Sequence, residues 1–219
     1  LLSDSTYAEV EGYTESERIV GQTIFESINN APGRVLISTF ASLISRIQQV
    51  INAAVEVDRK VVIVGRSMQN NVKMAIRNGY LHAPENTIIK LNKSKSLPND
   101  KLVIVATGSQ GEPSSAMVRI ANGKHPEVSI IKGDTVIFSS SPIPGNEVLV
   151  AKTIDNLFRQ GANVLYSKIA PVHVHGHGSK EELKLMINLV NPQFFVPIHG
   201  EYRHLIAHAN IAKSMGIDS

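Results

Sequence analysis

The sequence of 219 residues contains no cysteine and no tryptophan, and aromatic residues make up only 5% of it. Without cysteine, disulfide bonds and thiolate metal sites are excluded, so any metal ion must be bound by His, Asp or Glu. The absence also fits a reducing compartment, and we expect a cytoplasmic location. No apolar run approaches the ~20 residues of a membrane span, so we expect neither a signal peptide nor a membrane partner.

Excess charge of either sign is small as well. Lys and Arg number 22 against 19 Asp and Glu, which gives a formal net charge of +3 and a pI of about 9.1. This weakly basic balance permits an anionic partner without requiring one. Hydrophobic residues make up 42% of the chain, which predicts a soluble globular protein of one large domain or two small ones.

Short apolar, β-branched runs alternate with helical patterns along the chain. The runs suit strands buried on both faces of a parallel sheet, and they lie at Arg34–Ser38, Lys60–Gly65, Lys101–Ala106, Asp134–Ser139, Asn163–Ser167 and Gln193–Pro197. Helices are predicted at Glu15–Asn29, Leu43–Val57, Gln69–Asn78, Ser114–Ala121, Glu147–Gln160, Lys180–Leu189 and Tyr202–Met215. This repetition predicts an α/β fold with a Rossmann-like parallel sheet flanked by helices.

Local signals add detail at the ends of these elements. Thr14 and Glu17 have the spacing of a capping box at the first helix, and Gly79 and Gly161 are predicted to end helices. The stretch 84–98 is predicted to be a surface excursion around a short strand at 87–90. The stretch 1–4 reads as a buried strand followed by a polar turn, and we therefore expect the sequence to be an excerpt of a longer protein.

Three of the eight histidines occupy alternate positions: His173, His175 and His177. Alternate side chains of an extended segment share a face, so three imidazoles can point at one spot. His199 follows another apolar run. Imidazole is the commonest metal ligand and titrates near neutral pH, so metal binding, proton transfer and phosphate recognition all stay open. A solvated histidine-rich loop is the plain alternative.

Small polar residues follow several predicted strands, at 39–42, 65–67, 107–111 and 139–146. In open α/β sheets, ligands bind beyond the carboxyl ends of the strands, and helix N-termini there offer free N–H groups to phosphate. Ordinary N-capping explains any one of these loops. Several of them on one sheet edge favour phosphate binding.

An ordered set of motifs resembles the ribonuclease J family, bacterial nucleases of the metallo-β-lactamase fold and the β-CASP group. The resemblance runs from residue 1 to the end of the chain. The motifs are Leu2–Tyr7, Gly65–Met68, Thr107–Pro113, Phe138–Asn146, His173–Gly178 and Pro197–Arg203.

The resemblance implies a domain plan and roles for particular residues. Residues 1–16 would be a metallo-β-lactamase remnant, 17–178 an inserted β-CASP domain, and 179–219 the returning part of the first domain. Asp4, His177 and His199 match the family's motifs A, B and C, so His177 would be the general acid, Asp4 its catalytic partner and His199 a zinc ligand. From the start of the helix predicted at Leu43–Val57 itself, we predict that phosphate, sulfate or a nucleotide binds between this helix and the histidine loop, with free N–H groups of Ser42, Leu43 and Ile44 facing the anion. The loop residues of this site would be His173, Val174, His175, Gly176 and His177.

The sequence departs from the family pattern at two points that bear on the activity of this chain. The family's main zinc motif, HxHxDH, is absent, so we do not expect this fragment to hold the two zinc ions (Zn2+) of a complete site. His175 also stands where the family usually has a phosphate-binding serine.

The implied function is a zinc-dependent ribonuclease, with 5′–3′ exonuclease and endonuclease activity, acting in RNA maturation, including rRNA processing, and in mRNA decay. RNA would be its partner, in a homo-oligomer or a hetero-oligomer with a paralogue, and the fragment itself would be inactive. The alternatives are a non-catalytic RNA- or nucleotide-binding module of Rossmann type and a weakly active partner subunit. A hydrolase of small esters is disfavoured, because it does not need the β-CASP insertion.

Overall fold

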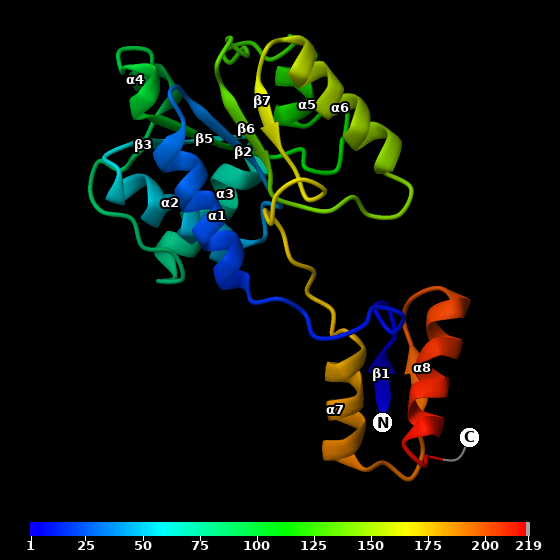
Figure 1. Ribbon diagram of the computed structural model, residues 1–219. Helices are drawn as coiled ribbons and strands as arrows, with labels where there is room; N and C mark the ends of the chain where they lie inside the picture. The colour runs from blue at the N-terminus through cyan, green and yellow to red at the C-terminus, as the bar shows by residue number, and fades with distance from the viewer. Residues whose placement is uncertain (218–219) are drawn as a thin grey trace. The chain divides into compact units, whose positions relative to one another are not determined.

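The computed structural model describes residues 1–217 and forms two compact units (Figure 1). The larger unit is Glu17–His173, and the smaller unit combines Leu1–Ser16 with the chain from Val174 onward. The second boundary therefore falls between His173 and Val174, whereas the sequence predicted it after Gly178. The assignment of the units to named parts of a metallo-β-lactamase fold stays a prediction.

The larger unit is built on a sheet of six parallel strands, which confirms the predicted fold class. The order is β4 (Ile88–Ile89), β3 (Lys60–Val64), β5 (Leu102–Ala106), β2 (Val35–Ser38), β6 (Thr135–Phe138) and β7 (Asn163–Leu165). Every residue of β2, β5 and β6 is buried. Continuous apolar runs were thus a sound signal for strands covered on both faces.

Helices cover the sheet on both faces. They are α1 (Glu17–Asn30), α2 (Ile44–Glu56), α3 (Arg66–Arg77), α4 (Leu91–Ser94), α5 (Ala116–Ala121) and α6 (Glu147–Arg159), with a short 3-10 helix at Asn99–Lys101. One core cluster joins Leu36 of β2 to residues of α5 and α6. The alternate residues Val35 and Ile37 are also buried and so face the opposite side. Among the other helices of this unit, α1 packs on α2, and both α2 and α3 contact β3.

Arg46 of α2 is fully buried and joins the two ends of the larger unit. Its guanidinium pairs with Glu17, the first residue of α1. It also donates to Ser139 and, at 2.9 Å, to the carbonyl oxygen of Val172. The buried charge is therefore paired and hydrogen-bonded, as a buried guanidinium must be.

The smaller unit pairs two short parallel strands with two helices. Strand β1 (Leu2–Asp4) pairs with β8 (Val196–Ile198), and α7 (Lys180–Val190) and α8 (Tyr202–Ser214) complete the unit. A small core holds them together, formed by Ala8, Leu183, Ile187, Ile211 and Ala212. The prediction of a buried first strand is wrong for this chain, because Leu2 is 68% exposed and β1 has β8 as its one neighbour in the described sheet.

The local signals had mixed outcomes. Gly79 and Gly161 follow the last residues of α3 and α6 with φ of 73° and 85°, as predicted. The capping box at Thr14 is wrong, because the hydroxyl of Thr14 binds Glu182 instead. The excursion at 84–98 contains the expected strand and also the unpredicted α4. No helix within residues 1–217 is both long and apolar enough to span a membrane.

Candidate active site

The site begins at the carboxyl ends of the two strands of the smaller unit. The register places Asp4 opposite Ile198, so His199 emerges directly beside Asp4. The N–H of Ser5 donates to the carbonyl oxygen of Ile198 at 2.9 Å and continues the pairing beyond the strand. At His199 the backbone adopts a left-handed conformation, with a φ of 57°. Polar side chains therefore gather where both strands end.

Asp4 and His177 form a hydrogen-bonded pair. Asp4 Oδ2 lies 3.0 Å from Nδ1 of His177, and Asp4 Oδ1 accepts the N–H of Thr6 at 2.8 Å. Burial raises the pKa of Asp4, but the hydrogen bonds from Thr6 and His177 and the charge of His177 outweigh it, so the pKa lies below its ordinary value. The carboxylate is therefore ionised and accepts from Nδ1, which leaves Nε2 of His177 available.

Aromatic rings stack around this pair. Tyr7 lies over His175 with ring centroids 3.7 Å apart, and the centroid of His177 is 5.5 Å from that of Tyr7. The rings of His177 and His199 are 5.9 Å apart. Nδ1 of His175 lies 2.8 Å from the carbonyl oxygen of His177, so Nδ1 carries the proton and donates. His175 can therefore offer a ligand only its Nε2.

The backbone of His177 is held by the start of α7. The hydroxyl of Thr14 lies 2.6 Å from Oε2 of Glu182 and 3.0 Å from the carbonyl oxygen of His177. Glu182 also accepts the N–H of Ser179 and forms the capping box of α7 with it. The hydroxyl of Thr14, followed by the N–H of Ser179, lowers the pKa of Glu182 despite an opposing effect of burial. An ionised carboxylate thus fixes the loop on which His177 lies.

His208 of α8 supports the site from inside the small core and was missed by sequence reasoning. It is fully buried, and its Nδ1 lies 3.0 Å from Oγ of Ser5, the residue after Asp4. Burial lowers the pKa of His208 below 6.5, although the charge of Asp4 acts in the opposite direction. His208 lies three and four residues before the apolar residues Ile211 and Ala212, and this helical spacing indicates that its side chain is buried. Nothing in the sequence indicates that Ser5 is its hydrogen-bond partner.

Asp4, His177 and His199 also form a group that could bind a metal ion. One candidate ligand atom from each lies within 4.8 Å of the others. Imidazole and carboxylate are the donors that zinc accepts in the absence of cysteine, so the residues fit zinc in kind. The hydrogen bond between Asp4 and His177 occupies one atom of each, so His199 is the member of the group whose ring has no hydrogen bond within residues 1–217.

The expected phosphate site divides between the two units. Ser42, Leu43 and Ile44 belong to the larger unit, as does His173, whereas Val174 to His177 belong to the smaller one. One part of the expectation is wrong: the N–H groups of Leu43 and Ile44 are not free, because they donate to the carbonyl oxygens of Phe40 and Ser42 at 3.2 and 3.0 Å. A phosphate site that combines the two segments stays a prediction.

Comparison with known proteins assigns the chain first to a class and then to a family. Residues 163–219 match the domain described as "Zn-dependent metallo-hydrolase RNA specificity domain", which makes the chain homologous to zinc-dependent hydrolases. Residues 32–157, more than half of the chain, match "Ribonuclease J, beta-CASP domain". The chain therefore belongs to the ribonuclease J family.

Curated relatives agree over almost the whole chain. Ribonuclease J of Synechocystis sp. is 48% identical over 219 residues, 100% of this chain and 34% of the relative. Ribonuclease J 1 of Streptococcus pyogenes and ribonuclease J2 of Bacillus subtilis are each 46% identical over 217 residues, 99% of this chain and 39% of the relative. The chain thus spans little more than a third of the length of these relatives.

Proposed function

We propose that the complete protein carrying this chain is a zinc-dependent ribonuclease that cleaves RNA as a 5′–3′ exonuclease and endonuclease in RNA maturation and mRNA decay. It would act in the cytoplasm, as a homo-oligomer or with a paralogue. The observation that carries the proposal is the Asp4–His177 pair beside His199 at the ends of β1 and β8. Family membership supports the substrate and the metal.

The chain's own residues supply proton transfer. Asp4 fixes Nδ1 of His177 as the donor toward the carboxylate, so Nε2 is the nitrogen that faces the substrate. Protonated at Nε2, His177 donates its proton to the leaving oxygen of a phosphodiester. The capping box of α7 and Thr14 keep the carbonyl of His177 in place, so the ring approaches from a fixed position.

His199 is the residue of this chain that would hold zinc, with the remaining ligands supplied outside it. When bound, zinc would polarise the phosphate and activate the attacking water. The chain contributes the position of His199, which is set by the end of β8 and by the turn at Gly200, where φ is 101°. A Cβ at Gly200 would come within 3.0 Å of Nδ1 of His204, so glycine allows α8 to start close to the site.

The proposal is tested by measuring zinc content and RNA cleavage together in the complete protein. His199→Ala should lower both, because a metal ligand is lost. His82→Ala is the matched control: His82 is exposed, lies in the larger unit and is outside the ligand group. Cleavage that survives both His199→Ala and complete removal of zinc would overturn the proposal.

A weakly active partner subunit, or a non-catalytic RNA-binding module, is the second candidate. The observation that favours it is His175, which stands at the position where the family usually has a phosphate-binding serine. Its ring stacks on Tyr7, and its Nδ1 donates to the backbone carbonyl of His177. His175→Ser distinguishes the two. A rise in cleavage rate with unchanged zinc content would support the weakly active subunit, and RNA binding without cleavage in either form would support the binding module.

A further inference from the structure

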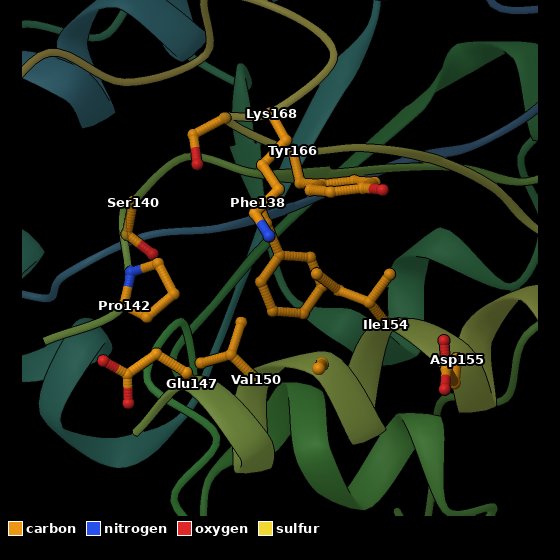
Figure 2. Close-up of a pocket in the computed structure, with 11 residues that line it drawn as sticks. Phe138, Ser140, Pro142, Glu147, Val150, Ile154, Asp155, Tyr166 and Lys168 are labelled. Carbon is orange, nitrogen blue, oxygen red and sulfur yellow. The ribbon is translucent and has the colours of Figure 1, made fainter. Parts of the chain in front are cut away.

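The larger unit contains a cavity of about 230 Å³ at the carboxyl ends of β6 and β7. Figure 2 shows the side chains that surround it. Phe138 is the last residue of β6, Tyr166 and Lys168 follow β7, and Val150, Ile154 and Asp155 come from α6. All of these residues belong to the larger unit, and neither Asp4 nor His177 lines the cavity.

The floor of the cavity is apolar. Phe138 is 1% exposed, Val150 5% and Ile154 8%, and all three belong to the core cluster of the sheet. An apolar wall left in contact with water costs about 25 cal/mol per Å² relative to a covered one. The cavity therefore favours a ligand part with apolar faces, and it disfavours a free phosphate group, which would lose its hydration there.

Tyr166 adds a flat aromatic wall. Its ring packs partly on the core cluster and lines the cavity together with the ring of Phe138 (Figure 2). The hydroxyl of Tyr166 has no hydrogen-bond partner within residues 1–217. A planar ring that enters the cavity can stack on such a wall, and it leaves the hydroxyl free for a polar contact.

The rim of the cavity carries charged side chains. Asp155 and Lys168 are exposed, and neither has an ion pair within the described part of the chain. Glu147 at the rim already accepts the N–H of Gly145 at 2.8 Å. The carboxylate of Asp155 is an acceptor for amino groups, as Asp and Glu are toward the amino group of cytosine. The ammonium of Lys168 can meet a phosphate outside the cavity.

We propose that this cavity binds one nucleobase that carries an exocyclic amino group, as part of an RNA strand. The inference rests on the proposed function, which makes RNA the ligand of the protein. Pockets for drug-sized ligands run to about 300–1,000 Å³, so this smaller cavity suits a single base. The base stacks on Tyr166, its amino group donates to Asp155, and the adjoining phosphate lies near Lys168.

Binding of short oligoribonucleotides to the complete protein tests the inference, with a chelator present to prevent cleavage. Fluorescence anisotropy would compare oligo(A), oligo(U) and an oligomer with abasic residues. Tyr166→Leu keeps apolar bulk but loses the aromatic face, and it should weaken oligo(A) binding by about 5- to 100-fold, the range for one lost base–aromatic stack. Tyr166→Phe should bind nearly as well as the wild type. Asp155→Asn should reduce the preference for oligo(A) over oligo(U).

Two further variants separate binding from folding. Ala151→Leu fills the cavity from an exposed position of α6 without removing a core side chain, and it should weaken oligo(A) binding too. Tyr80→Ala is the control, because Tyr80 is 76% exposed and does not line the cavity. Equal binding of abasic oligomer and oligo(A), or unchanged affinity in folded Tyr166→Leu and Ala151→Leu, would overturn the inference.

The remaining outcomes are also decisive. Binding of N-acetyl-phenylalaninamide that Ala151→Leu abolishes, with no binding of adenosine, would overturn the inference in favour of a protein partner. Zinc-dependent cleavage is read separately. Normal cleavage with no effect of Tyr166→Leu on binding rejects the base pocket alone, whereas base binding without cleavage by the wild type rejects the proposed nuclease alone.

Discussion

The single hydrogen bond between Asp4 and His177 decides which nitrogen of the imidazole can react. In the complete protein, His177→Ala should slow the chemical step by about 10²–10⁴-fold, the usual effect of losing a general acid. Asp4→Asn should keep zinc but misorient the ring, so its effect should resemble that of His177→Ala. If Asp4 acts only through His177, the double variant should be no slower than His177→Ala. Single-turnover rates with zinc content measured for each variant provide the check, and multiplicative losses would assign Asp4 a separate role.

His208 predicts a pH dependence of stability in the smaller unit. Burial lowers its pKa from an ordinary 6.5, so between that value and the lower folded value the unfolded chain binds a proton that the folded chain does not. Stability contributed by neutral His208 is therefore present above pH 6.5 and is lost as pH falls through the folded pKa.

Unfolding free energies of wild type and His208→Gln, measured from pH 7.5 down to about 5, test this. The wild type should lose stability more steeply than the variant. His125, whose pKa is also lowered by burial, remains in both proteins, so its contribution cancels in the comparison. Parallel curves would show that His208 is not the titrating group.

At the scale of elements, the packing of α2 depends on a buried charged residue, Arg46. The apolar pattern of the helix predicts that this position is buried but does not predict its partners. Arg46 lies four residues before Val50 and so falls on the buried stripe of the helix. Its removal leaves the hydroxyl oxygen of Ser139 without a donor and Glu17 without its cation, whereas the carbonyl oxygen of Val172 keeps the hydroxyl of Ser139 as a donor. We expect Arg46→Ala to lower the free energy of unfolding by about 2–4 kcal/mol, below the full value for a buried pair because Glu17 is 37% exposed.

Denaturant unfolding checks this prediction, with Lys101→Ala as the control. Lys101 pairs with Asp58 at 2.9 Å, but Asp58 is 82% exposed and Lys101 39%, so the pair is solvated and its loss should have little effect on stability. Similar losses in the two variants would show that the buried position of Arg46 adds nothing.

Local patterns predicted the elements of the larger unit well. The prediction for α2, Leu43–Val57, differs by one residue at each end from Ile44–Glu56, because an apolar period of 3.6 depends only on neighbours in the sequence. The start of α3 was missed by three residues, since Gly65 with a φ of 105° allows the helix to begin directly after β3. Thr14 and Glu17 have the spacing of a capping box for α1, yet the hydroxyl of Thr14 donates to Glu182 of α7 instead.

At the scale of the whole molecule, the candidate site depends on contacts that no local pattern encodes. Thr14 meets Glu182 across 168 positions of sequence, and Asp4 meets His177 across 173. The second contact could be anticipated only through the resemblance to a family. His208, whose partner Ser5 lies 203 positions away, had no such guide. Composition and periodicity thus predicted the sheet, whereas the geometry of the site required the fold.

The chain of 219 residues by itself should bind zinc weakly and cleave RNA little or not at all. With Nδ1 of His177 committed to Asp4, the group offers zinc two imidazole nitrogens, Nε2 of His177 and one from His199. Stable zinc sites use three or four protein ligands, so two are too few. Both oxygens of Asp4 already accept hydrogen bonds, from Nδ1 of His177 and from the N–H of Thr6, so recruiting Asp4 as a third ligand competes with one of these bonds. Metal analysis of the purified chain after dialysis, combined with an RNA turnover assay, tests this expectation. One tightly held zinc per chain together with turnover would show that Asp4, His177 and His199 form a sufficient site on their own.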